Sequence, residues 1–137
     1  MSHKIKVGDS YEYEFSFSQE DVEAFAKVSG DNNPVHLDEE FASKTIFKQP
    51  IIHGFLSASV FSKVLGTDFP GFGSIYLKQT MDFLRPMYVN LKYKAKFTVE
   101  EINEARHQAV IKTEVVDLEK GKTTISGSAT VMHKERI

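Results

Sequence analysis

The segment that most constrains the fold is the run Ile52–Leu65, which is apolar almost all the way round. Apart from a histidine-glycine pair near its start, only small serines and one lysine interrupt its aliphatic and aromatic side chains. A helix that is apolar on most faces has to be buried on most faces. The glycine that follows, Gly66, is predicted to end it. The rest of the chain must therefore wrap around one central helix.

The second half of the chain has the alternating pattern of β-strands. Apolar and polar residues alternate with a period of two, which gives each segment one face that can be buried. The predicted strands are Ser74–Phe83, Lys92–Glu100, Ala109–Val115 and Ile125–Val131. Turn-forming residues at Asn103-Glu104 and Glu119–Gly121 separate the last three. We expect an antiparallel sheet that curves around the central helix, which is an α+β fold.

The N-terminal part adds one strand and two helices. Tyr11–Phe17 alternates aromatic and polar residues and is predicted to be a half-buried strand. Ser18 is expected to cap a helix that has acidic residues in its first turn and ends at Gly30. A shorter helix is predicted for about Asp38–Ser43. Since the chain has no repeat, linker or low-complexity tract, residues 1–137 are predicted to form a single domain.

Composition excludes several classes of function. A net charge of −2, without a long block of either sign, argues against nucleic acid or a membrane surface as a partner. The absence of cysteine excludes disulfides, thiolate metal sites and a cysteine nucleophile. No apolar run reaches the length of a bilayer span, and no signal-like stretch follows the first lysines. We therefore expect a cytoplasmic protein.

The loop after the first predicted helix carries the strongest candidate for chemistry. Asp31 and His36 are separated there by two asparagines, a proline and a valine. Pro34 restricts the residue before it and asparagine favours Asx turns, so the loop should be stiff. A carboxylate and an imidazole have different ordinary pKa values and can divide the roles of base and acid near neutral pH. In an arbitrary loop such residues are more often a cap and a packed histidine, so the spacing alone leaves both interpretations open.

The residues around this pair resemble a known family signature. The segment SGDNNPVH, which ends at His36, and the later pair His53-Gly54 are similar to the signature of the MaoC-like family, the (R)-specific enoyl-CoA hydratases. The stretch Pro70–Pro86 is similar to another segment of that family. The resemblance implies a hot-dog fold, a homodimer or dimer of dimers, and no cofactor. It also implies an acyl-thioester substrate carried by coenzyme A or by an acyl carrier protein.

The resemblance also implies roles for individual residues. Asp31 would take a proton from water, His36 would supply one to the substrate, and the backbone N–H of Gly54 would hold the developing enolate oxygen. A glycine at a helix N-terminus suits that last role, because its amide is unobstructed and the helix dipole favours negative charge. Ser62 is expected to support the pair. The residues predicted to contact the substrate are Asn33, Pro34, His53, Phe55, Gly73 and Ser74, although the ring of His53 could instead only cap or pack.

Two other functions stay open on the sequence. A hot-dog thioesterase would place a carboxylate on the central helix, and Ile52–Leu65 contains none. A non-catalytic acyl-binding module would be expected to have lost Asp31 or His36. A metal site is not predicted, because the histidines lack the paired spacing that metal sites in helices use.

Overall fold

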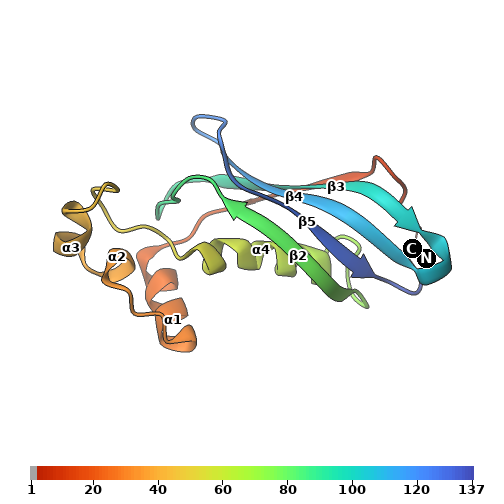
Figure 1. Cartoon of the computed structure of the whole chain (residues 1–137), viewed down its shortest axis with the longest axis horizontal. Coiled ribbons are helices and arrows are strands. Elements are labelled where there is room, and N and C mark those ends of the chain that lie inside the picture. The colour runs from red at the N-terminus through yellow and green to blue at the C-terminus, as the bar shows by residue number, and fades with distance from the viewer. Residues whose placement is uncertain (1–2) are drawn as a thin grey trace.

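A curved antiparallel sheet around one long helix forms the core of the protein (Figure 1). The computed structural model describes residues 3–137. The sheet has five strands in the order β1-β3-β4-β5-β2. The strands are β1 Ser10–Phe15, β2 Ile75–Phe83, β3 Tyr93–Asn103, β4 Gln108–Asp117 and β5 Thr123–Met132. The helices are α1 Gln19–Ser29, α2 Pro34–Leu37, α3 Glu39–Ser43 and α4 Gly54–Thr67, and a 3-10 turn, η1, covers Glu104–Arg106.

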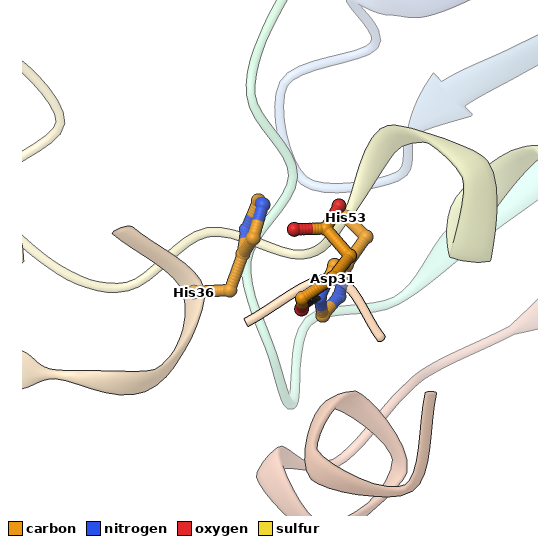
Figure 2. A group of neighbouring side chains, drawn as sticks. All are labelled: Asp31, His36 and His53. Carbon is orange, nitrogen blue, oxygen red and sulfur yellow. Dashed lines mark hydrogen bonds between the residues drawn. The ribbon is translucent and has the colours of Figure 1, made fainter. Parts of the chain in front are cut away.

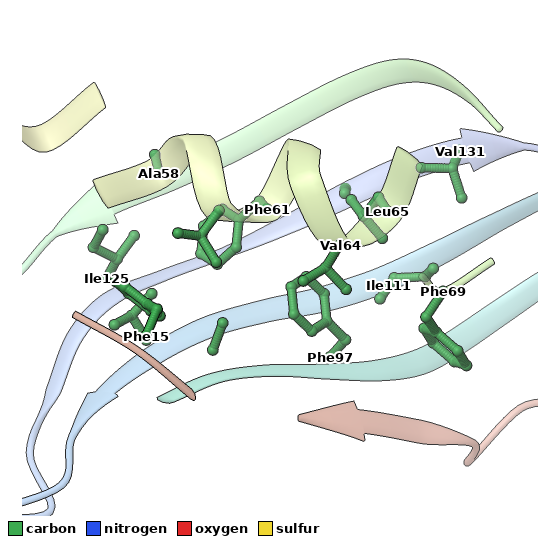
Figure 3. Packing of buried hydrophobic residues seen from close by; sticks show 14 of the residues in the cluster. Phe15, Ala58, Phe61, Val64, Leu65, Phe69, Phe97, Ile111, Ile125 and Val131 are labelled. Carbon is green, nitrogen blue, oxygen red and sulfur yellow. The ribbon is translucent and has the colours of Figure 1, made fainter. Parts of the chain in front are cut away.

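Helix α4 is the central helix that the sequence predicts. Seven of its residues are buried, namely Leu56, Ser57, Ala58, Val60, Phe61, Val64 and Leu65. In Figure 3, Phe61, Val64 and Leu65 point towards apolar side chains of the strands. The ring of Phe61 lies edge-on to that of Phe97 in β3, with 5.9 Å between the ring centroids. This is a favourable arrangement for two aromatic rings, because the positive edge of one faces the negative face of the other.

The prediction that Gly66 ends this helix is wrong, since the helix continues to Thr67. A glycine inside a helix costs only about 1 kcal/mol. Interactions of the last turn oppose that cost: the Thr67 hydroxyl donates to the Lys63 carbonyl, and Lys63 Nζ lies 2.7 Å from a carboxylate oxygen of Asp68. At the other end the helix starts at Gly54, because His53 has non-helical backbone angles (φ −54°, ψ 134°) and Ile52 donates its N–H to the carbonyl of Met87.

The predicted strands are confirmed, with ends that differ by at most three residues. Neighbouring strands are antiparallel throughout. The buried positions of β3 and β4 alternate as the pattern requires, whereas β5 buries two successive residues, Thr124 and Ile125. Their inward-facing residues include Phe97, Ile111, Val115, Ile125 and Val131, all at most 1% exposed. Together with α4 they give the predicted α+β arrangement.

The segment between β1 and α4 lies beyond the end of the sheet at which α4 begins (Figure 1). Ser18 caps α1 in a reciprocal capping box with Asp21, and Gly30 ends this helix with a left-handed backbone, as predicted. The stretch Pro34–Leu37 is one turn of helix, α2, where the sequence predicted only a loop. Asn33 caps that turn through its side chain, and proline is favourable at its first position.

Strand β2 forms one edge of the sheet and exposes an unusual amount of apolar surface. Along β2 and its flanks, Phe72, Ile75, Leu77, Phe83 and Leu84 are between 46% and 83% exposed. Exposed apolar patches on an unpaired strand edge commonly mark a contact with another chain. Within residues 3–137, no helix is long and apolar enough to cross a membrane.

Candidate active site

Three side chains from separate segments meet at the start of α4 (Figure 2). Asp31 lies in the loop after α1, His36 lies in α2, and His53 directly precedes α4. One polar side-chain atom of each lies within 4.8 Å of the corresponding atoms of the other two. In Figure 2 the carboxylate of Asp31 is turned towards the His36 ring. The folded chain therefore brings together the carboxylate and the imidazole that the sequence singled out.

The His36 ring is held in one orientation and one tautomer. Its Nδ1 lies 2.8 Å from the carbonyl oxygen of Ile51. Because a carbonyl can only accept, Nδ1 carries the hydrogen, and Nε2 is left as the nitrogen that can gain or lose a proton. The side chain is largely buried, yet it lines a cavity. His36 therefore presents a single reactive nitrogen to a partly enclosed space.

Asp31 lies on an exposed turn whose shape depends on short polar contacts. Its backbone N–H donates to the Ser29 hydroxyl at 3.1 Å, and its carboxylate accepts from the N–H of Asn33 at 3.3 Å. Asn33 in turn accepts from the N–H of Val35 at 3.1 Å and so starts α2. The backbone carbonyl of Asp31 accepts a hydrogen bond from Nε2 of His53 at 3.1 Å. These contacts form the stiff Asx turn expected from the sequence.

Gly54 is the first residue of α4 and borders the same cavity. Its N–H has no acceptor among residues 3–137, as expected for the first turn of a helix. A side chain here would collide with Phe83, because an added Cβ would lie 2.7 Å from a carbon of that ring. The absence of a side chain therefore allows Phe83 to pack against the helix start.

The cavity next to these groups has a volume of about 450 Å³. Its walls are mostly apolar and include Phe47, Ile52, Phe55, Phe83, Met87 and Ile125. Polar groups reach it from His36, Ser57 and Arg85. Asp31 is exposed and is not part of its lining. An apolar cavity with a few polar groups at one end is typical of a small-molecule site.

The chain matches known proteins over most of its length. Residues 3–134 match the family model described as MaoC like domain. The chain belongs to the MaoC-like family. It is 38% identical over 130 residues to an (R)-specific enoyl-CoA hydratase of Aeromonas caviae, covering 95% of this chain and 96% of that protein. It is also 38% identical over 128 residues to an (R)-specific enoyl-CoA hydratase of Rhodospirillum rubrum, covering 93% and 88% of the two chains.

The fold agrees with that membership. A solved structure of the (R)-hydratase from A. caviae superposes with a TM-score of 0.90 at 38% identity, covering 94% of this chain and 97% of that one. The predicted hot-dog fold is therefore confirmed. This MaoC-like chain therefore shares the fold of that (R)-hydratase.

Other residues predicted for the site of this MaoC-like protein lie apart from the cavity. Ser62 is exposed on α4, and among the described residues no hydrogen bond joins it to Asp31 or His36. Gly73 and Ser74 precede β2, and an added Cβ on Gly73 would lie 3.1 Å from the ring of His133. Their roles stay predictions.

The predicted substrate contacts nearer the pair divide into two groups. Phe55 borders the cavity, and its contact with substrate stays a prediction. Asn33 and Pro34 are exposed and form the start of α2, and His53 is buried behind the cavity without lining it. Contact of the last three with substrate, like the cytoplasmic location, stays a prediction.

Two cavity residues were missed from the sequence. Ser57 is not among the predicted site residues, but it is buried and borders the cavity, and its hydroxyl has no hydrogen-bond partner among residues 3–137. Its position three residues after Gly54, one helical turn on, was the available signal. Arg85 is the lining residue with a permanent charge, and its Nη1 donates to the carbonyl of Thr123 at 2.7 Å. The sequence feature that could have indicated Arg85 is its position directly before Pro86, after the end of β2.

The three converging side chains are poorly arranged to hold a metal ion. The rings of His36 and His53 stack, with 4.0 Å between centroids and 28° between planes. The lone pair of an imidazole lies in the ring plane, so nearly parallel rings direct their lone pairs side by side and not towards one ion. One nitrogen of each ring is also bound to a backbone carbonyl. The arrangement suits proton transfer better than metal ligation.

Proposed function

We propose that this protein is a hydro-lyase that adds water to a trans-2-enoyl thioester and gives the (R)-3-hydroxyacyl thioester, or removes water in the reverse direction. The observation that carries the proposal is the approach of the Asp31 carboxylate to the His36 ring beside the cavity where α4 begins. The names of the relatives in A. caviae and R. rubrum support it.

In the hydration direction, Asp31 acts as the base and His36 as the acid. A water held by the pair attacks C3 of the enoyl group as its proton moves to Asp31. The protonated Nε2 of His36 gives its proton to C2 on the same face of the double bond. Transfer of a proton from Asp31 back to His36 restores the pair.

Gly54 supplies the charge stabilisation. As the water adds, negative charge develops on the thioester oxygen, and a preorganised N–H donor lowers the energy of that state. Gly54 borders the cavity, and its amide lies at the positive end of the α4 dipole. The acyl chain then lies along the apolar walls, with Phe55 and Phe83 among them.

The carrier of the acyl group enters from the side of Arg85. Coenzyme A and acyl carrier protein both present the thioester on a phosphorylated pantetheine arm. A guanidinium group at the cavity can bind that phosphate, since two of its three nitrogens make no hydrogen bond within residues 3–137. Arg85→Gln is expected to raise KM for an enoyl-CoA more than for a short enoyl thioester that lacks phosphate.

The working form is a homodimer, or a pair of such dimers, joined along β2. The free edge of β2 and its exposed apolar side chains support this assembly. Antiparallel pairing of two β2 strands would bring Gly73 and Ser74 of one chain towards the Phe83 end of the other. Light scattering after size exclusion tests it, and a monomer for the wild type together with full activity would contradict it.

The direct test of the reaction is hydration of crotonyl-CoA, followed as loss of enoyl absorbance with chiral analysis of the product. The proposal predicts the (R)-3-hydroxy product alone. Hydrolysis of saturated acyl-CoA, followed by release of free thiol, is the competing activity. The structure disfavours it, because α4 has no carboxylate. Thiol release without hydration would overturn the proposal in favour of a thioesterase, and tight acyl-CoA binding without turnover would favour a binding module.

A further inference from the structure

His53 is one of the most buried polar residues of the protein, and it lies directly behind the Asp31–His36 pair. It is 2% exposed and precedes the first residue of α4. Its ring stacks on that of His36, and the ring of Phe25 in α1 meets it edge-on, at 4.8 Å between centroids. The imidazole is therefore held between α1 and α2 at the start of α4. It is not part of the cavity lining.

The ring of His53 also ties down the loop that carries Asp31. Its Nε2 donates to the backbone carbonyl of Asp31 at 3.1 Å. Within the described chain, every other hydrogen bond of residues 30–33 goes to a partner at most four residues away. The side chain of Asp31 is exposed and gains little from packing. The bond from His53 is thus the connection between this loop and the interior.

The hydrogen bonds also define the protonation state of His53. A carbonyl can only accept, so Nε2 carries the hydrogen and Nδ1 carries a lone pair. Nδ1 is buried and has no partner in the described chain. A second proton there would create a buried, unpaired charge next to the acid of the pair. Burial accordingly lowers the pKa of His53. The hydrogen bond to the Asp31 carbonyl opposes that shift, and neighbouring His36 lowers the pKa further.

We infer that His53 is a positioning residue for the proposed reaction: its uncharged ring fixes the backbone of Asp31 by one hydrogen bond and supports the face of His36 by stacking. This inference rests on the proposed function. It replaces the expectation that His53 contacts the substrate. It also explains why a histidine stands before α4 although its side chain makes no capping hydrogen bond.

Two substitutions separate the two contacts. In His53→Gln the side-chain amide can still donate to the Asp31 carbonyl from about the place of Nε2, but the ring is lost. In His53→Phe the ring and its stacking stay, but the donor is lost. We expect His53→Phe to lower kcat for crotonyl-CoA by about 10–100-fold with KM changed less than about threefold, because a displaced group at the reacting centre costs this much. His53→Gln should recover most of that loss.

Val64→Ala is the control for a general loss of stability. Val64 is fully buried in the same helix, at the end away from the pair. The substitution should lower the melting temperature without lowering kcat. If His53→Phe has no larger effect on kcat than Val64→Ala at the same loss of stability, the positioning role is refuted. The same holds if His53→Gln is no better than His53→Phe.

A double-mutant cycle shows whether His53 acts through Asp31. In the Asp31→Asn background, His53→Phe should cost little more, because residues that act as a unit are not additive. If the fold-losses in kcat of the two single variants multiply in the double variant, the inference is contradicted. The Asp31→Asn single variant also separates the two failures: if it keeps wild-type hydration, then the proposed reaction scheme has failed, whatever His53 does.

A measurement on the unchanged protein completes the test. Nitrogen-15 NMR of the imidazole groups should show His53 as the neutral tautomer protonated at Nε2 at pH 7.5, with its protonation midpoint below the ordinary value of 6.5. A His53 signal that is protonated at Nδ1, or that becomes the cation at or above pH 6.5, would overturn the inference.

Discussion

The two ends of α4 differ in how completely they are packed. At the C-terminal end, Val64 and Leu65 are at most 1% exposed and contact an apolar cluster that includes Phe69 (Figure 3). At the N-terminal end, the same helix borders a cavity of about 450 Å³, and two buried polar atoms, His53 Nδ1 and Ser57 Oγ, have no partner in residues 3–137. Buried polar atoms are nearly always paired in proteins, and exceptions commonly mark functional sites. Stability and chemistry are therefore expected to depend on opposite ends of one helix.

The largest effect is expected at the N-terminal end. Asp31→Asn and His36→Ala should each lower kcat for crotonyl-CoA hydration by about 10²–10⁴-fold, because each removes one partner in proton transfer. Since Asp31 is exposed, its replacement should change the melting temperature little. Rates and thermal unfolding of the same samples check this. A large loss of stability with normal turnover in the folded fraction would break the comparison.

The matching change at the core is Phe61→Ala. Phe61 is 1% exposed, and removing a buried phenylalanine lowers the free energy of unfolding by about 3–5 kcal/mol. Urea unfolding measures this loss. The turnover per folded molecule should stay close to that of the wild type, because the ring faces Phe97 and not the cavity.

Gly54→Ala tests the first residue of α4, which packs against Phe83 and also borders the cavity. The added methyl group would press on the Phe83 ring, which is the end of a side chain and can shift, so we expect folding to survive. We expect kcat to fall by about 10–100-fold, because the helix start and its amide move relative to the pair. Steady-state kinetics with crotonyl-CoA checks this, and unchanged kcat would remove Gly54 from the proposed site.

The pH dependence of stability sharpens the account of His53. Its pKa is lowered in the folded protein, so below the ordinary value of 6.5 the unfolded chain takes up a proton that the folded chain resists. The stabilising contribution is present above pH 6.5 and is lost as the pH falls towards the lowered pKa. Urea unfolding at pH 7.5 and 5.5 should show a larger fall for the wild type than for His53→Gln. Equal falls would contradict a buried neutral His53.

The smallest effect is expected from metal removal. Because stacked imidazoles do not direct their lone pairs to one ion, dialysis against a chelator should leave hydration unchanged. The assay is the crotonyl-CoA rate before and after dialysis. Loss of activity that added zinc restores would show that the three side chains rearrange to hold a metal.

Regular patterns were enough to predict the frame of the molecule. The alternation in β3 and β4 and the all-round apolar character of α4 follow from burial alone, and the structure confirms them. The errors were local. Gly66 continues a helix because contacts of the last turn offset its cost, and Pro34–Leu37 turns helical because Asn33 caps it. In such short segments the helical and non-helical conformations have similar free energies, so the hydrophobic pattern alone does not predict which one forms.

The site was predictable to the extent that it is local in sequence. The convergence of Asp31 with His36 follows from one short segment, and the position of Gly54 at a helix start follows from the apolar run. The sequence did not predict the residues that distant segments of the chain contribute to the site. Arg85 reaches the cavity only because β2 ends beside α4, and the stacking of His53 on His36 depends on how α2 docks.

The central claim is that Asp31 and His36 act on the substrate as one unit. The measurement that tests it most directly is the rate of crotonyl-CoA hydration by Asp31→Asn, by His36→Ala and by the double variant. We predict that the double variant loses little more than the worse single variant, since either change alone disables the pair. Independent losses that multiply, or single variants that hydrate crotonyl-CoA at the wild-type rate, would contradict the claim.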